Sequence, residues 1–228
     1  MARVFCSISD SYLARVGADA FRLIEKYIIA GGLGSDKDDF EAIKERLLHP
    51  PVLNAEQFAE EAIYVILAGG FRQKVAKRKF GEIMAYIRAG GEVSAEKLLP
   101  IFNNRNKMNA VAKIWNGRLG YRGGFYALGS VEEKLRFLAR LPHIGEITKN
   151  HLARNLGISN VKYDVWIQRL GIALCGGPDM RAGFPLDPGV KDACDRMFSE
   201  ISAQTGYDRG YVDVVLWKAC QTGILSFV

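Results

Sequence analysis

The chain has 228 residues and carries 31 lysines and arginines against 25 aspartates and glutamates, a formal net charge of +6. Hydrophobic residues make up 49% of the chain and charged residues 25%, which excludes a disordered chain, a collagen-like repeat and a coiled-coil rod. No apolar run reaches the roughly 18–20 residues that a membrane-spanning helix needs, and the first residues do not resemble an export signal. We therefore expect an intracellular, cytoplasmic protein with no membrane partner. The net charge permits binding to a polyanion but does not predict it.

The cysteines and histidines do not predict a metal site. Four cysteines lie far apart and form no C-x-x-C pair, and the three histidines lack metal-ligand spacing. We expect buried, reduced thiols and no bound metal at these side chains. The sequence also lacks a glycine-rich phosphate loop of the G-x-x-x-x-G-K-[ST] kind.

In the first half of the chain, apolar residues recur at steps of three and four, which predicts helices. A run of glycines at 31–34 ends the first of these helices, and Asn54 with Gln57 forms a capping box at the start of the third. The helix after Gly70 is basic and amphipathic. The predicted helices cover residues 9–29, 38–48, 54–68, 71–87, 94–102 and 106–119.

The second half begins with a predicted loop at 121–126, which is rich in aromatic residues and glycine. Ser130 and Glu133 form a second capping box, which starts a helix at 131–140. Two more helices are expected near 188–204 and 209–221. Because no stretch alternates apolar and polar residues for long enough to build a sheet, we predict an all-α fold of about ten helices.

The densest motif lies at residues 138–157, where a tight turn joins two amphipathic helices. Pro142 ends the first helix, and Gly145 lets the backbone approach another molecule closely at the start of the second. Ile144 is expected to anchor the turn in the core. Unpaired backbone amides at the start of the second helix can hold an anion such as a phosphate. Taken alone, such a helix pair is more often plain packing, but Asp164 soon follows at the start of a further helix.

The combination L-P-x-I-G-x-x-T, followed by V-K-x-D-x-x-x-x-R-L, resembles the helix-hairpin-helix (HhH-GPD, endonuclease III-like) DNA glycosylase superfamily. The strong match covers about 138–170, and a weaker one extends over 58–83. The resemblance implies a two-lobed, all-α fold with a cleft between the lobes. One lobe, a six-helix barrel with the hairpin at 138–157, would span about 52–160. The other would combine about 1–50 with 161–228.

The resemblance also implies a function. The hairpin would grip the phosphate backbone of double-stranded DNA, with a monovalent cation at the turn carbonyls as the possible cofactor, and the target nucleotide would be flipped out of the duplex. Asp164 would be the catalytic carboxylate; the alternative is that it caps the helix that follows it, and both roles can hold together. We expect the protein to act as a monomer. The expected DNA contacts are Pro142, His143, Ile144, Gly145, Ile147, Thr148, Lys149, Phe71, Arg72 and Lys162.

Two positions depart from the superfamily pattern. Members that also cleave the strand carry a Schiff-base lysine where this chain has Ile147, and Lys149 should face away from that position on the helix. We therefore expect no covalent imine. His143 stands where glycine is usual, which either adds a DNA contact or reflects a relaxed turn. Phe71 and Arg72 are candidates to fill the gap left by a flipped base, the alternative being that Phe71 packs in the core.

Three functional hypotheses follow. The first is a monofunctional DNA N-glycosylase that excises a modified base with Asp164 and has no lyase step. The second is an enzyme resembling certain phage proteins of this scaffold, which attach an amine or amino acid to an activated 5-hydroxymethyl pyrimidine in DNA. The third is a non-catalytic DNA-binding protein that uses the hairpin alone. An acid at position 164 disfavours the third hypothesis, because mere binding does not need it.

Overall fold

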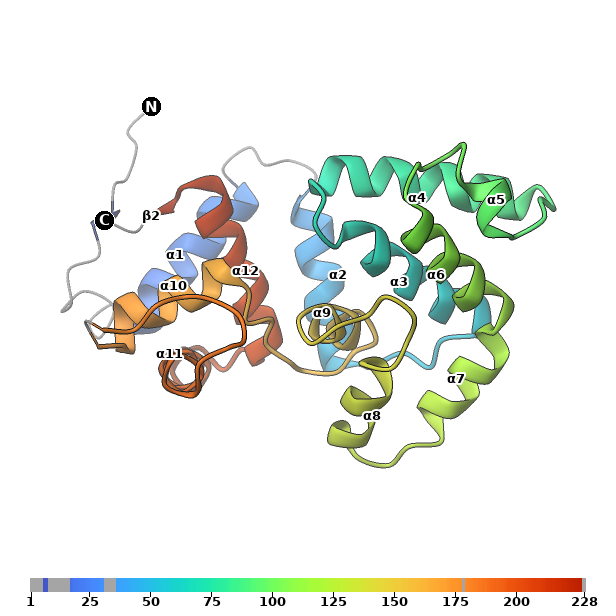
Figure 1. Cartoon of the computed structure of the whole chain (residues 1–228). Helices are drawn as coiled ribbons and strands as arrows, with labels where there is room; N and C mark the ends of the chain where they lie inside the picture. The colour runs from blue at the N-terminus through green and yellow to red at the C-terminus, as the bar shows by residue number, and fades with distance from the viewer. Residues whose placement is uncertain (1–5, 8–16, 31–35, 178, 227–228) are drawn as a thin grey trace. The chain divides into compact units, whose positions relative to one another are not determined.

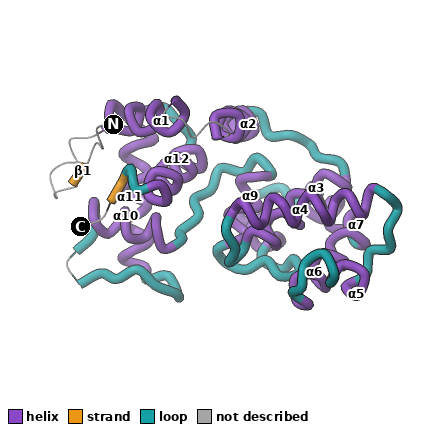
Figure 2. Tube along the Cα trace, turned by 90° about the horizontal axis from the view of Figure 1, so that it is seen from above, coloured by secondary structure: helices purple, strands orange, loops and turns teal. Residues whose placement is uncertain are grey.

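The computed structural model describes residues 6–7, 17–30, 36–177 and 179–226. These residues form twelve helices and one pair of two-residue strands, so the predicted all-α class is confirmed (Figures 1 and 2). The predicted turn at 31–34 and the part of the first predicted helix before Gly17 lie outside the described residues. Among the described helices, none combines the length and the apolar character needed to cross a membrane.

The chain divides into two compact units. Unit 1 comprises Met1–His49 and Ser159–Val228, and unit 2 comprises Pro50–Ile158. The elements of unit 1 are β1 (Cys6–Ser7), α1 (Gly17–Ala30), α2 (Asp36–Leu48), α10 (Val165–Cys175), α11 (Pro188–Thr205), α12 (Arg209–Thr222) and β2 (Leu225–Ser226).

Unit 1 is built around the packing of α10 against α11 and of α1 against both α11 and α12. Its buried apolar core includes Phe21, Leu170, Phe198 and Val215. The two short strands pair in parallel, with Cys6 opposite Leu225. This packing fixes the start of α10, the helix that follows Asp164.

Unit 2 is built around one central helix, α3, which packs against α4, α6, α7 and α9. Seven of the fourteen residues of α3 are buried in the apolar core. The helices of unit 2 are α3 (Ala55–Ala68), α4 (Gln73–Arg88), α5 (Ala95–Leu98), α6 (Arg105–Asn116), α7 (Arg118–Tyr126), α8 (Val131–Leu138) and α9 (Thr148–Asn155). Val65, Ile66 and Leu67 in the last turn of α3 are buried, whereas Ala68 at its end is half-buried.

Both predicted capping boxes are confirmed. The Asn54 side chain accepts from the Gln57 amide at 2.9 Å while the Gln57 side chain accepts from the Asn54 amide at 3.0 Å. Ser130 and Glu133 make the same reciprocal pair at the start of α8. These boxes set the first residues of α3 and α8 as the sequence predicts.

The predicted loop at 121–126 is wrong, because these residues belong to α7. Phe125 is buried in the core of unit 2. The Arg122 Nε donates to the Leu53 carbonyl at 3.0 Å, and the Tyr126 hydroxyl accepts from the Leu53 amide at 2.9 Å. These tertiary contacts outweigh the low helix propensity of the three glycines in α7.

Mutation of Tyr126 tests whether its hydrogen bonds anchor α7. Its hydroxyl also donates to the Pro51 carbonyl at 3.2 Å, so Y126F leaves two backbone groups without their partner. We expect Y126F to lower the free energy of unfolding by about 1–2 kcal/mol in chemical denaturation. The matched control is Y27F, because Tyr27 is half exposed and makes no hydrogen bond to a described residue. Equal stability of the two variants would contradict the anchoring role.

Candidate functional site

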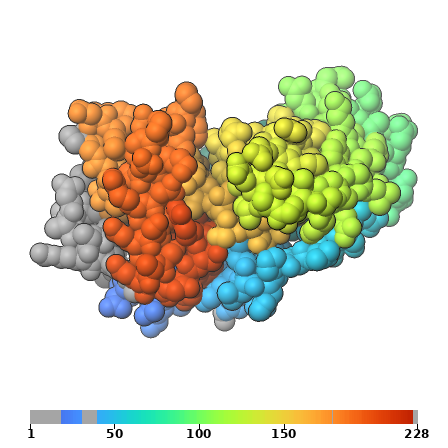
Figure 3. Space-filling model, turned by 90° about the horizontal axis from the view of Figure 1, so that it is seen from below, coloured from blue at the N-terminus to red at the C-terminus, as the bar shows by residue number. Residues whose placement is uncertain are grey.

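The hairpin between α8 and α9 is anchored by apolar side chains and closed by one hydroxyl. Leu141 and Ile144 are buried, so Ile144 anchors the turn as expected and has only its backbone to offer a ligand. The Gly145 amide donates to Thr148 Oγ1 at 2.8 Å. The space-filling view shows α8, in yellow-green, at the surface of unit 2 (Figure 3).

The start of α9 carries unused hydrogen-bond donors. Within the described residues, the backbone amides of Glu146, Ile147 and Thr148 donate no hydrogen bond, while the Lys149 amide donates to the Gly145 carbonyl at 2.9 Å. Adjacent unpaired amides at a helix start attract anions, because the helix dipole adds positive charge there. This part of the hairpin therefore suits a phosphate group.

His143 lies in the left-handed region of backbone conformation, with φ of 61°. A glycine would adopt this conformation freely, whereas a side chain with a Cβ is strained there. Desolvation by burial, and then the positive charge of Lys107, lower the pKa of His143 below its usual value. The imidazole is therefore predominantly neutral at pH 7.

The turn also carries carbonyl oxygens that accept no backbone hydrogen bond within the described residues, those of Pro142, His143 and Ile144. Oxygen donors of this kind are the ligands that hard cations prefer, so the turn fits the expected monovalent cation in donor type. No group of three or more His, Cys, Asp or Glu side chains among the described residues could hold a metal ion.

Neither Ile147 nor Lys149 offers a free amine at the hairpin. Ile147 is the residue before α9 and is half-buried. The Lys149 ammonium is engaged in an ion pair with the Glu146 carboxylate.

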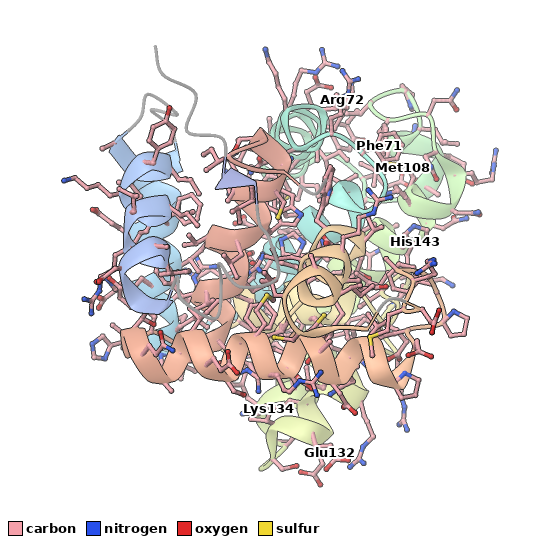
Figure 4. All side chains as sticks on the ribbon, turned by 90° about the vertical axis from the view of Figure 1, so that its left-hand side faces the viewer. Phe71, Arg72, Met108, Glu132, Lys134 and His143 are labelled. Atoms are coloured by element: carbon pink, nitrogen blue, oxygen red, sulfur yellow. The ribbon has the colours of Figure 1, made fainter. Side chains whose placement is uncertain are left out.

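The loop after α3 lies against the hairpin. A Cβ added to Gly69 would be 3.7 Å from Thr148 Cγ2, which is ordinary van der Waals contact. Phe71 is 41% exposed, so the interpretation that it packs in the core is not supported. Figure 4 shows Phe71, Arg72 and His143 on the same side of unit 2 in that view.

Lys107 is a residue of this region that the sequence analysis missed. It is only 3% exposed, and its Nζ donates to the carbonyls of Ile66, Leu67 (3.2 Å) and Gly69 (2.6 Å). Desolvation by burial lowers its pKa to about 8. One signal could have found it: Lys107 occupies the apolar stripe of α6, four residues before the buried Val111.

In unit 1, Asp164 caps the start of α10. Its Oδ1 accepts from the amides of Trp166 at 3.0 Å and Ile167 at 3.2 Å, so the N-cap interpretation is confirmed. Its Oδ2 lies 3.4 Å from the Lys162 ammonium, and only 15% of the carboxylate side chain is exposed. The carboxylate therefore has one oxygen bound to the helix and a second oxygen beside a cation.

The segment that carries Asp164 is held by three helices of unit 1. The Lys162 amide donates to the buried Asp213 Oδ2 of α12 at 3.2 Å, and the Tyr163 hydroxyl donates to Asp195 Oδ1 of α11 at 2.6 Å. From α10, Gln168 Nε2 donates to the Tyr163 carbonyl at 2.9 Å. Burial, and then the hydrogen bond to Asp195, raise the pKa of the Tyr163 hydroxyl. The backbone around Asp164 is thus fixed from several directions.

The chain was compared with known proteins. A scan against models of protein families gave no match, and a search of the curated proteins gave no relative. Among solved structures, the chain is similar to the 8-oxoguanine DNA glycosylase of Thermotoga maritima, with a TM-score of 0.56 and 17% identity. The match covers 91% of this chain and 93% of that one. This likeness shows that the chain has the fold of a DNA glycosylase.

The lowered pKa of Lys107 makes stability depend on pH. Between about pH 8 and pH 10.5 the folded protein releases this proton while the unfolded chain still holds it, so rising pH favours the folded state. We expect the free energy of unfolding of the wild type, relative to K107M, to rise by at most about 1.4 kcal/mol per pH unit in this window.

Chemical denaturation at pH 7.5 and pH 9.5 measures this difference. Cys194 and Cys220, whose pKa values burial raises to about 12, lower stability at high pH in both proteins and cancel in the comparison. A difference between wild type and K107M that does not change with pH would contradict the assignment.

Proposed function

We propose that this protein is a monofunctional DNA N-glycosylase, which binds double-stranded DNA as a monomer and excises a modified base. The observation that carries the proposal is the Asp164 carboxylate, which is capped, mostly buried and fixed at the start of α10. It stands in a chain with the fold of a DNA glycosylase, at the position that the sequence motif assigns to the catalytic acid.

The chemistry assigned to Asp164 follows from its surroundings. As the bond between C1′ and the base nitrogen breaks, the electron pair leaves with the base and the sugar becomes an oxocarbenium ion. The ionised carboxylate stabilises that positive charge, and water then adds to C1′ and loses a proton to give an abasic site. Because Oδ1 is committed to α10, Oδ2 is the oxygen that faces this task.

Unit 2 supplies the proposed grip on DNA. We assign a backbone phosphate to the unpaired amides at the start of α9, next to Pro142, His143 and Gly145, with Thr148 and Lys149 at the edge of this contact. The monovalent cation would be held by the turn carbonyls and would add positive charge there. Phe71 and Arg72 are proposed to fill the space that the flipped base leaves. In unit 1, Lys162 is assigned to a phosphate beside Asp164.

The first test uses D164N, in which an amide replaces the carboxylate. We expect D164N to keep duplex binding within a few-fold and to lose at least about a hundredfold in single-turnover rate, because the charge that stabilises the oxocarbenium ion is removed. Suitable substrates are duplexes that carry 8-oxoguanine, the base named for the similar structure, or a 5-hydroxymethyl pyrimidine. Full activity of D164N would contradict the catalytic assignment.

Mass spectrometry of the product nucleosides identifies the reaction. A free base with an abasic site supports the glycosylase. A heavier nucleoside that carries an added amine or amino acid would show the transferase reaction instead. Binding without any product from either substrate, when wild type and D164N behave alike, would favour the non-catalytic DNA-binding protein.

The second test concerns the absent lyase step. Because Ile147 has no amine and Lys149 is paired with Glu146, borohydride should trap no covalent complex between the wild type and abasic DNA. I147K, which places an amine at this position, serves as the comparison under the same conditions. A trapped complex with the wild type would contradict the monofunctional assignment, and its loss in K149M or K162M would identify the amine.

A further inference from the structure

We propose that Lys107 is a positioning residue that fixes Phe71 relative to the hairpin. The distance between the proposed phosphate contact of the hairpin and the side chain that displaces the base then stays constant. This inference rests on the proposed function, because it assigns to Lys107 a part in base displacement. Lys107 lies in α6, outside the sequence motif, and acts through contacts with backbone carbonyls and an aromatic ring.

The Lys107 ammonium bonds several carbonyls at the end of α3. Helix α3 ends at Ala68 and is followed by Gly69 and Gly70, and the φ of 76° at Gly70 lets the chain turn away without strain. The Gly69 amide already bonds the Val65 carbonyl at 3.1 Å. Lys107 Nζ donates to three further carbonyls, including that of Gly69 in the loop itself, and so uses all three of its N–H groups.

This arrangement has an energetic cost. Burying an ammonium is unfavourable unless its hydrogen bonds are satisfied, and the lowered pKa of Lys107 reflects that cost. A glycine-type helix end needs no buried charge. The ammonium therefore does more than end α3, because it attaches the Gly69 end of the loop rigidly to α6.

Phe71 lies beside the Lys107 ammonium. Its ring lies 4.7 Å from the Lys107 ammonium and makes an edge-to-face contact with Phe102 at 5.0 Å between centroids. Phe71 is nevertheless 41% exposed. An exposed aromatic side chain that is already held in place loses less conformational entropy when it enters a base stack than a mobile one does.

The same lysine is linked to the hairpin through Gly69, to whose carbonyl it donates. A Cβ added at Gly69 would lie 3.7 Å from Thr148 Cγ2, so the loop residue that Lys107 binds is close to the start of α9. One buried side chain thus holds the part of the loop that lies beside the hairpin.

The experiment measures base displacement without chemistry. The D164N protein is mixed with a duplex that carries 2-aminopurine beside the target base, and the rise in fluorescence reports unstacking. We expect F71A and K107M each to lower the equilibrium constant for displacement by about tenfold. The double variant should be no worse than F71A alone, because Lys107 acts through Phe71. Binding to an undamaged duplex should change less than about threefold.

The matched control is K113M, which removes an exposed lysine from the same helix and should leave the fluorescence signal unchanged. If K107M does not fold, K107Q is measured in its place, because its amide keeps two donors for the carbonyls without the charge. Additive losses in the double variant, or an unchanged signal in the Lys107 variant, would overturn the inference. A complete absence of duplex binding and displacement in D164N itself would instead count against the proposed function.

Discussion

The carbonyl oxygens at the end of a buried helix must find donors, and in unit 2 this constraint falls on α3. Ile66 and Leu67 in its last turn are buried, so their carbonyls need donors from the protein. Lys107 supplies the missing donors from α6. Lys107 thereby holds the end of α3 and the first residue of the loop that carries the exposed Phe71, close to Thr148 of the hairpin.

Asp164 meets the corresponding requirement at a helix N-terminus, where backbone amides need acceptors. The first amides of α10 need an acceptor, and Oδ1 provides it. Two hydrogen bonds hold this carboxylate at the start of α10, and a catalytic carboxylate needs such a fixed position in order to meet a developing charge without reorganisation. The structural role and the proposed catalytic role therefore support each other. The Lys162 ammonium, 3.4 Å from Oδ2, adds a further contact that holds the carboxylate in place.

Local rules predicted the helix starts well, and tertiary packing explains where they failed. Asn54 and Ser130 cap their helices with residues three positions away, so a short sequence window contains the whole interaction. Residues 118–126 form a helix because Tyr126 and Arg122 bind Leu53, which is about seventy residues earlier in the chain. The sequence did not predict the role of Lys107 for the same reason. A single lysine in a helix is usually exposed to solvent, and its burial becomes evident only when the carbonyls of another helix are seen beside it.

The availability of each positively charged side chain to a phosphate depends on its local ion-pair partners. Lys149 is paired with Glu146, and Lys162 with the carboxylate of Asp164, so a phosphate that meets these cations competes with an existing ion pair. Arg72 and Lys74, by contrast, make no ion pair with any described residue. Both lie within three residues of Phe71 and have their charge available to a phosphate. The excess of six positive charges is therefore a poor measure of the proposed DNA affinity, to which we expect these two cations and the unpaired amides at the start of α9 to contribute most.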